Sequence, residues 1–239
     1  MAHIKNVQAF EKLLGVCTGL GGSYKPGKQN LHVSVMHSMF VEAQQALSEV
    51  KEAKTLYNQA TNHREELFKA TDKLASSMYH VLQASSANVL TTEDARRALN
   101  RLLNGVRSVG ESGTASVESP PPSRKWKGYG RDYATRIQHF AQLVDIVSKE
   151  ADYTPEEQEL QVDALWQRIA ALQAANTKVL QTSLILAKAR SKRNEVLYAA
   201  KWSLYKTVRA VKAYVKAIFG TTSPSYQLLV AARFTKPSA

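Results

Sequence analysis

The chain has 239 residues, of which 44% are hydrophobic, and this is enough to bury a core in one large or two small domains. Only 11 Gly and seven Pro occur, whereas helix-forming residues are abundant, so we predict an all-α protein. Thirty-two Lys and Arg against 20 Asp and Glu give a formal net charge of +12. Such an excess favours an anionic partner, although it can also serve solubility alone.

The charge is unevenly divided along the sequence. Residues 1–119 contain 13 Lys and Arg against 11 Asp and Glu, and residues 120–239 contain 19 against nine. The second half of the chain is therefore the basic one.

The sequence indicates a reducing compartment and no membrane insertion. Cys17 is the only cysteine, which excludes an intramolecular disulfide. No long apolar segment follows the first residues, so we expect a cytoplasmic protein or one exported by a signal-peptide-independent route. The longest uncharged run, residues 74–92, is interrupted by Ser, Gln and Asn side chains, so we expect no integral membrane segment.

The first predicted element is a short amphipathic helix that ends near Gly19, Gly21 and Gly22. Its apolar residues recur at helical spacing: Val7, Phe10, Leu13, Leu14 and Cys17. Because no His or cationic residue stands beside Cys17, we interpret it as a buried structural thiol.

A Tyr-x-Pro turn, Tyr24 to Pro26, precedes a very long helix, where Pro26 suits the first turn. The long helix carries apolar residues at alternating steps of four and three, which is the heptad pattern of a helix that packs along a neighbour. This heptad seam contains Met36, Phe40, Ala43, Leu47, Val50 and Tyr57, with Lys54 as its polar member.

The same order of elements returns 129 or 130 residues later. A short helix with Ile137, Phe140, Leu143, Val144 and Val147 is followed by the turn Tyr153 to Pro155. The second heptad seam contains Leu165, Ile169, Leu172, Asn176, Val179, Ser183 and Leu186. We therefore predict an elongated helical bundle of two pseudo-repeated units, each a short helix, a Tyr-x-Pro turn and a very long helix.

The predicted first repeat covers residues 1–107 and includes an extra helix at 92–107. A Ser/Gly/Pro-rich linker at 108–130 separates it from the second repeat at 131–239, which ends in a C-terminal arm at 221–239. The arm can fold back on the bundle or dock on another chain.

Each long helix spans about sixty helix-compatible residues, or about 90 Å at 1.5 Å per residue. From 158 to 219 no Gly or Pro interrupts it, so we expect it unbroken or merely kinked. The alternative is a hairpin that turns near Asn62 and His63, and near Ser191 and Lys192 in the second repeat.

The segment 211–220, the motif Ser223-Pro224-Ser225-Tyr226 and the two Tyr-x-Pro turns resemble a group of uncharacterised duplicated α-helical bacterial proteins. The resemblance implies the fold of both repeats. It implies no activity.

No catalytic motif stands out. None of the six His has a Glu three residues before it, and no Gly-rich phosphate loop followed by Lys-Ser/Thr occurs. The adjacent carboxylates Glu65-Glu66 and Glu156-Glu157 point away from each other on a helix, as on a solvated face. We therefore expect no enzymatic activity, no cofactor and no metal.

The heptad seams favour a structural protein that self-associates into a homo-oligomer, such as a filament, sheath or scaffold subunit. The residues expected to form this assembly seam are Met36, Phe40, Leu47, Val50, Tyr57, Leu165, Ile169, Leu172, Val179 and Leu186. Intramolecular packing of the two long helices uses the same physics.

A second hypothesis is a basic aromatic face near the C-terminus, where no acidic residue follows Glu195. Its members are Tyr198, Trp202, Tyr205, Lys206, Arg209, Lys212 and Lys216. Such a face could bind nucleic acid, a lipid surface or an acidic protein surface, including that of another copy; it could also simply be solvated. At the corresponding positions the first repeat has Lys73, Ser77, His80, Gln83 and Ala87, so the fold does not require the basic residues.

The linker ends in a basic aromatic peptide that contains Arg124, Lys125, Trp126 and Lys127. It is a further candidate contact for an anionic partner, or only the soluble end of the linker. The third hypothesis is a membrane-active helical protein, and the polar residues that interrupt the apolar stretches of the helices disfavour it.

Overall fold

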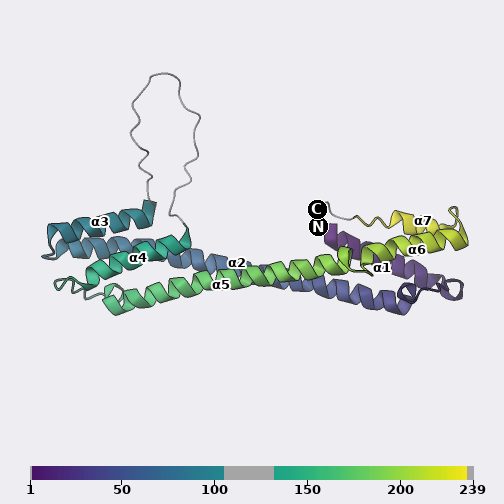
Figure 1. The fold of residues 1–239 in the computed structure, drawn as a ribbon, viewed down its shortest axis with the longest axis horizontal. Helices are drawn as coiled ribbons and strands as arrows, with labels where there is room; N and C mark the ends of the chain where they lie inside the picture. Colours follow the sequence, from purple (N-terminus) through teal and green to yellow (C-terminus); the bar gives the residue numbers. More distant parts are fainter. Residues whose placement is uncertain (1, 105–131, 236–239) are drawn as a thin grey trace, which may run out of the picture. The chain divides into compact units, whose positions relative to one another are not determined.

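The computed structural model describes residues 2–104 and 132–235 (Figure 1). Within these residues all regular structure is helical, so the predicted all-α class is confirmed. The linker at 108–130, with Arg124, Lys125, Trp126 and Lys127, lies outside the described residues.

The chain forms two compact units that do not coincide with the predicted repeats. Unit 1 comprises Met1–Asn58 and Thr182–Ala239, and unit 2 comprises Gln59–Gln181. Unit 1 therefore combines the start of the first predicted repeat with the end of the second. The duplication itself stays a prediction about the sequence.

Unit 1 contains α1 (Ala2–Gly19), the first part of α2 (Val33–Ala84), the last part of α5 (Val162–Asn194), α6 (Leu204–Phe219) and α7 (Pro224–Ala231). A short π-helical turn, η4 (Glu195–Ala199), follows α5. The largest fully buried side chains of this unit are Phe10, Leu13, Met36, Leu197, Leu204 and Leu229. Residues from both ends of the sequence thus share one core.

Unit 2 contains the last part of α2, α3 (Val89–Asn104), α4 (Tyr133–Ser148) and the first part of α5. Its largest fully buried side chains are Met78, Leu82, Phe140, Leu143, Leu165 and Leu172. The predicted extra helix at 92–107 corresponds to α3, which packs against α4.

Each Tyr-x-Pro turn contains the same kind of hydrogen bond. The buried Tyr24 hydroxyl donates to the carbonyl oxygen of Leu31 at 3.0 Å, and the buried Tyr153 hydroxyl donates to that of Leu160 at 3.0 Å. Each acceptor ends a short 3₁₀ turn, η2 (Gln29–Leu31) or η3 (Gln158–Leu160). A tyrosine side chain therefore closes each turn, and the two tyrosines are 129 residues apart in the sequence.

The two long helices differ in continuity. Helix α2 has 52 residues without interruption, so there is no hairpin at Asn62 and His63. The stretch expected as one helix from 158 to 219 is instead divided into η3, α5, η4 and α6, with a break between Ala199 and Leu204. The expectation of an unbroken second helix is wrong at this break, and the alternative turn at Ser191 and Lys192 is absent as well.

Side-chain capping accounts for the break. Ser203, fully buried, accepts a hydrogen bond from the backbone amide of Lys206 and so caps the start of α6. The Lys206 amine donates to the carbonyl oxygens of Ala199 and Ala200 at 3.4 and 3.0 Å, which satisfies the end of η4. These contacts replace the backbone hydrogen bonds that a continuous helix would make.

The C-terminal arm folds back on unit 1. Gly220 ends α6 with a φ of 80°, a conformation that favours glycine, and Ser223 caps α7. Helix α7 contacts α6 and α1, and Leu229 is fully buried.

The heptad seams are largely buried, and part of each lies in the core of a unit. Met36, Leu165 and Leu172 are fully buried, and Leu47, Val50 and Tyr57 are half-buried. The remaining members, Phe40, Ile169, Val179 and Leu186, are at most 9% exposed. Intramolecular packing therefore covers most of the assembly seam within one chain.

Candidate anion-binding surface of unit 1

The whole net charge of the chain falls in unit 1. Its sequence contains 17 Lys and Arg against five Asp and Glu, which gives +12, whereas unit 2 contains 15 against 15 and is neutral. Division of the sequence into halves does not show this, because unit 1 takes residues from both ends. The excess of positive charge therefore belongs to one unit.

Helix α6 carries an exposed row of cations. Lys206, Arg209 and Lys216 are exposed and share one side of the helix, since they are three and seven residues apart. The opposite side is buried in the core of unit 1 and consists of Leu204, Val208, Val211 and Val215. From Lys206 to Lys216 the row extends about 15 Å at 1.5 Å per residue.

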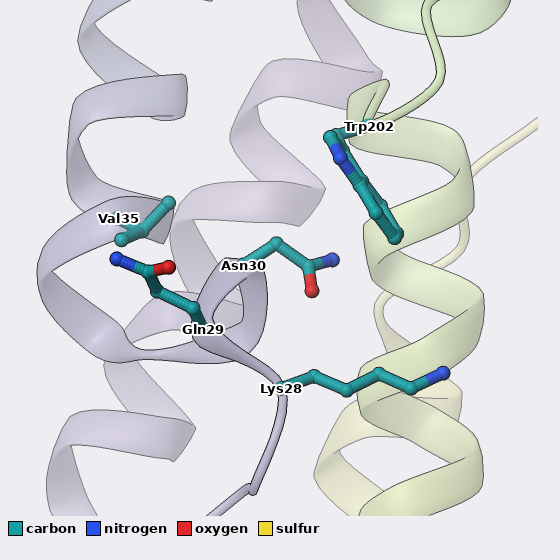
Figure 2. A pocket seen from close by; sticks show the side chains of 5 residues that line it. All are labelled: Lys28, Gln29, Asn30, Val35 and Trp202. Carbon is teal, nitrogen blue, oxygen red and sulfur yellow. The ribbon is translucent and has the colours of Figure 1, made fainter.

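Trp202 stands in the break just before α6, with 52% of its surface exposed. It borders an open hollow of about 470 Å³ that is also lined by Lys28, Gln29, Asn30 and Val35. Figure 2 shows the side chains of Asn30 and Lys28 extending toward the segment that carries Trp202, with Val35 and Gln29 on the other side. The lining thus offers an aromatic ring, two amides and an ammonium group, and no carboxylate.

A second hollow, of about 280 Å³, also includes Trp202 but is different in charge. Glu42 and Glu195 line it together with Lys192. The acidic residues near Trp202 are therefore on this hollow, and the hollow beside Lys28 is the one suited to an anionic group.

Tyr198 does not belong to the exposed face predicted from the sequence. It is 8% exposed, and its hydroxyl accepts a hydrogen bond from the Asn6 side chain at 2.8 Å and lies 2.8 Å from His3 Nδ1. Burial raises the pKa of the Tyr198 phenol above its ordinary value. Its role is to join η4 to α1.

Tyr205 and Lys212 contact the C-terminal segment. Tyr205 is half-buried, and its ring centroid lies 6.0 Å from that of Phe234. The half-buried Lys212 amine donates to the carbonyl oxygen of Ala232 at 2.9 Å, and burial lowers the pKa of Lys212. Both residues hold the end of the chain against α6.

Four of the predicted residues remain exposed on or beside α6, and we call them the α6 surface: Trp202, Lys206, Arg209 and Lys216. Lys28 and Asn30 join Trp202 although the sequence analysis did not include them. No local pattern could have identified them, because more than 170 residues separate them from Trp202.

Metal-binding groups and the cysteine thiol are two kinds of group that can take part in catalysis. Within residues 2–104 and 132–235, no group of three or more His, Cys, Asp or Glu is arranged to hold a metal ion. Cys17 is 1% exposed, and burial raises the pKa of its thiol to about 11. A thiol of this kind is a poor nucleophile at neutral pH.

No helix in the described part of the chain is long and apolar enough to cross a bilayer. No protein-family model matches the sequence, and no match is found among curated proteins or solved structures.

Proposed function

We propose that this protein is a non-catalytic helical scaffold that binds single-stranded nucleic acid through unit 1. The observation that most supports this function is that the whole net charge of +12 lies in unit 1. Neutralisation of phosphates by Lys and Arg releases counterions and supplies most of the affinity of sequence-independent binding.

The α6 surface has the two components that single-stranded nucleic acid requires. Exposed cations follow the phosphates, and an exposed aromatic ring offers a face on which a base can stack, worth about 1–3 kcal/mol per base. Lys206, Arg209 and Lys216 provide the cations, and Trp202 provides the ring. The amides of Gln29 and Asn30 lie in the same hollow as Trp202, within reach of polar base edges.

A lipid surface is a weaker candidate for this partner. A helix that lies in a membrane interface inserts an apolar face among the acyl chains. The apolar face of α6, with Val208, Val211 and Val215, is buried in unit 1. Between Lys206 and Lys216 the exposed side of α6 carries Arg209 and the small residue Ala213. The exposed large hydrophobic residue of α6 is Ile218, at 58%, which lies beyond Lys216.

Binding of a fluorescent single-stranded oligonucleotide, followed by anisotropy, tests this function. Each phosphate contact to a single strand contributes about −0.7 to the slope of log affinity against log salt. With four to six contacts we expect a slope of about −3 to −4 between roughly 50 and 200 mM salt.

Two pairs of charge-reversal substitutions distinguish the contribution of the α6 surface to binding from the effect of the total charge. The variant R209E/K216E should weaken binding about a hundredfold, because two phosphate contacts become repulsive. The control K69E/K73E changes the net charge equally but alters exposed residues of unit 2, and it should have a much smaller effect. Lys206 is left unchanged because it also caps η4.

Trp202→Ala should weaken binding by roughly tenfold and remove the part of the tryptophan fluorescence quenching that comes from Trp202. Equal losses in the two charge-reversal pairs would refute the α6 surface as the contact. If the protein binds an acidic polypeptide but not the oligonucleotide, its partner is an acidic protein surface and not nucleic acid.

Self-association, as a scaffold or filament subunit, is a second candidate function. Since the cores cover most of the heptad seams, it needs a different surface. The exposed apolar residues Leu56 and Ile185, both in unit 1, provide one.

A further inference from the structure

We infer that a second copy of this chain docks on the groove between α2 and α5 in unit 1, so that two copies form a two-fold dimer. This inference is independent of nucleic-acid binding, because the groove shares no residue with the α6 surface.

Four of the eight residues that line the groove are apolar. The groove has a volume of about 500 Å³ and is lined by Ala53 and Leu56 of α2 and by Ile185 and Ala189 of α5. Leu56 is 48% exposed and Ile185 is 49% exposed, whereas Ala53 is buried. The apolar lining thus combines two small alanine side chains with two larger ones that are about half exposed.

The charged residues of the groove are separated by helix. The α2 side carries Glu49 and Glu52, and the α5 side carries Lys188 and Lys192. The Lys192 amine lies 2.9 Å from a carboxylate oxygen of Glu49. Two acids and two bases make this lining neutral, in contrast to the +12 of unit 1 as a whole. Two copies can therefore approach here without bringing an excess of cations together.

The arrangement is complementary to itself. Glu49 contacts Lys192, and the groove then continues to Leu56 on one helix and Ile185 on the other, so α2 and α5 are antiparallel in this part of unit 1. A two-fold axis along the groove brings the α2 side of each copy over the α5 side of the other. Glutamates then face lysines, and Leu56 faces Ile185 of the second copy.

This self-complementarity favours a second copy over an unrelated protein as the occupant. A two-fold contact of this kind uses the same patch on both copies and closes at a dimer. A filament would require another, different contact.

Charge swaps on the full-length, nuclease-treated protein test the dimer by sedimentation velocity over a wide concentration range. Glu52→Lys alone should weaken dimerisation about tenfold, because it places two lysines opposite each other, and Lys188→Glu alone should do the same. The double variant E52K/K188E restores opposite charges across the interface. Its dissociation constant should return to within a few-fold of the original value.

Ile185→Asp should reduce dimerisation by more than tenfold, because it places a carboxylate against Leu56 of the second copy. Leu228→Asp is the matched control, since Leu228 is also exposed, at 61%, but lies on α7 outside the groove. A protein that remains monomeric up to millimolar concentration would overturn the inference. So would a double variant as weak as the single ones, or an equal loss in Leu228→Asp.

Discussion

The side chain of Asn6 holds the backbone of Thr235 with both ends of its amide. Its Nδ2 donates to the carbonyl oxygen of Thr235 at 2.7 Å, and its Oδ1 accepts from the amide of Thr235 at 3.0 Å. Asn6 is 1% exposed, and the same Nδ2 also donates to Tyr198. One polar residue on α1 thus ties together the beginning, the π-helical turn and the end of unit 1.

Asn6→Ala should destabilise unit 1 by about 1–3 kcal/mol, because it leaves polar groups of Thr235 and Tyr198 without their buried partner. The free energy of unfolding in urea measures the loss. Hydrogen exchange should also accelerate across α7 and the residues that follow it. Gln8→Ala, an exposed position on the same helix, is the control. If α7 keeps its protection in Asn6→Ala, the Asn6 amide does not hold the arm.

The local periodicity of the sequence predicts the helices and their buried faces well. Phe10 and Leu13 in the first helix, and Met36 in the second, are all fully buried. Each assignment depends only on residues within a few turns of the same helix. The pattern predicts the buried face correctly because an amphipathic helix buries its apolar stripe whichever element it packs against.

The sequence does not predict which helix ends share a core. The helical spacing predicts that Tyr198 lies on an exposed face, but it is buried by a contact with Asn6, which is 192 residues away. Division of the sequence into halves assigns part of the net charge to each half, whereas unit 1 contains residues from both ends and has the whole net charge. These properties arise from long-range pairing, which no local pattern contains.

The sequence does not predict the break before α6 either, because the break contains no Gly or Pro. Its only local sign is Ser203, and serine is common both as a helix cap and inside helices. The Lys206 contacts that stabilise the break depend on its geometry and become apparent only in the structure.

Ser203→Ala tests the role of the cap. We expect a loss of about 1 kcal/mol in the free energy of unfolding, because the start of α6 loses the acceptor for its backbone amide. Ser191→Ala, an exposed serine in α5, should change stability by much less. Equal stability of the two variants would mean that the break does not depend on the Ser203 side chain.

In unit 2, Asn176 is a polar member of the heptad seam, and its Oδ1 accepts a hydrogen bond from Arg64 at 3.1 Å. The Arg64 guanidinium carbon lies 3.7 Å from the ring centroid of Tyr133. Asn176→Leu introduces the residue that the first repeat has at the corresponding position, Leu47. It should still destabilise unit 2 by about 1–3 kcal/mol, because a partly buried cation loses its acceptor.

A double-mutant cycle isolates this contact. Asn176→Leu, Arg64→Met and the double variant, compared by urea denaturation, should give a coupling energy of about 1–2 kcal/mol. A cycle in which the two losses simply add would show that the hydrogen bond contributes nothing to the stability of unit 2.

Cys17 should make the stability of unit 1 depend on pH in the alkaline range. Burial raises the pKa of its thiol from the ordinary 9.0 to about 11 in the folded protein. Between these values the unfolded chain releases a proton that the folded chain retains. Stability should therefore be unaffected by Cys17 below pH 9 and fall as the pH rises toward 11, by at most about 1.4 kcal/mol per pH unit.

Cys17→Val is the matched variant for this measurement, because the corresponding residue of the second short helix is Val147, which is also fully buried. Cys17 is also one cause of the raised pKa of Tyr24, so the difference between the two proteins reports the thiol together with its effect on Tyr24. Urea denaturation from neutral pH to about pH 11 should show the wild-type protein losing stability relative to Cys17→Val. Parallel pH profiles would mean that the Cys17 thiol ionises equally readily in the folded and unfolded chains.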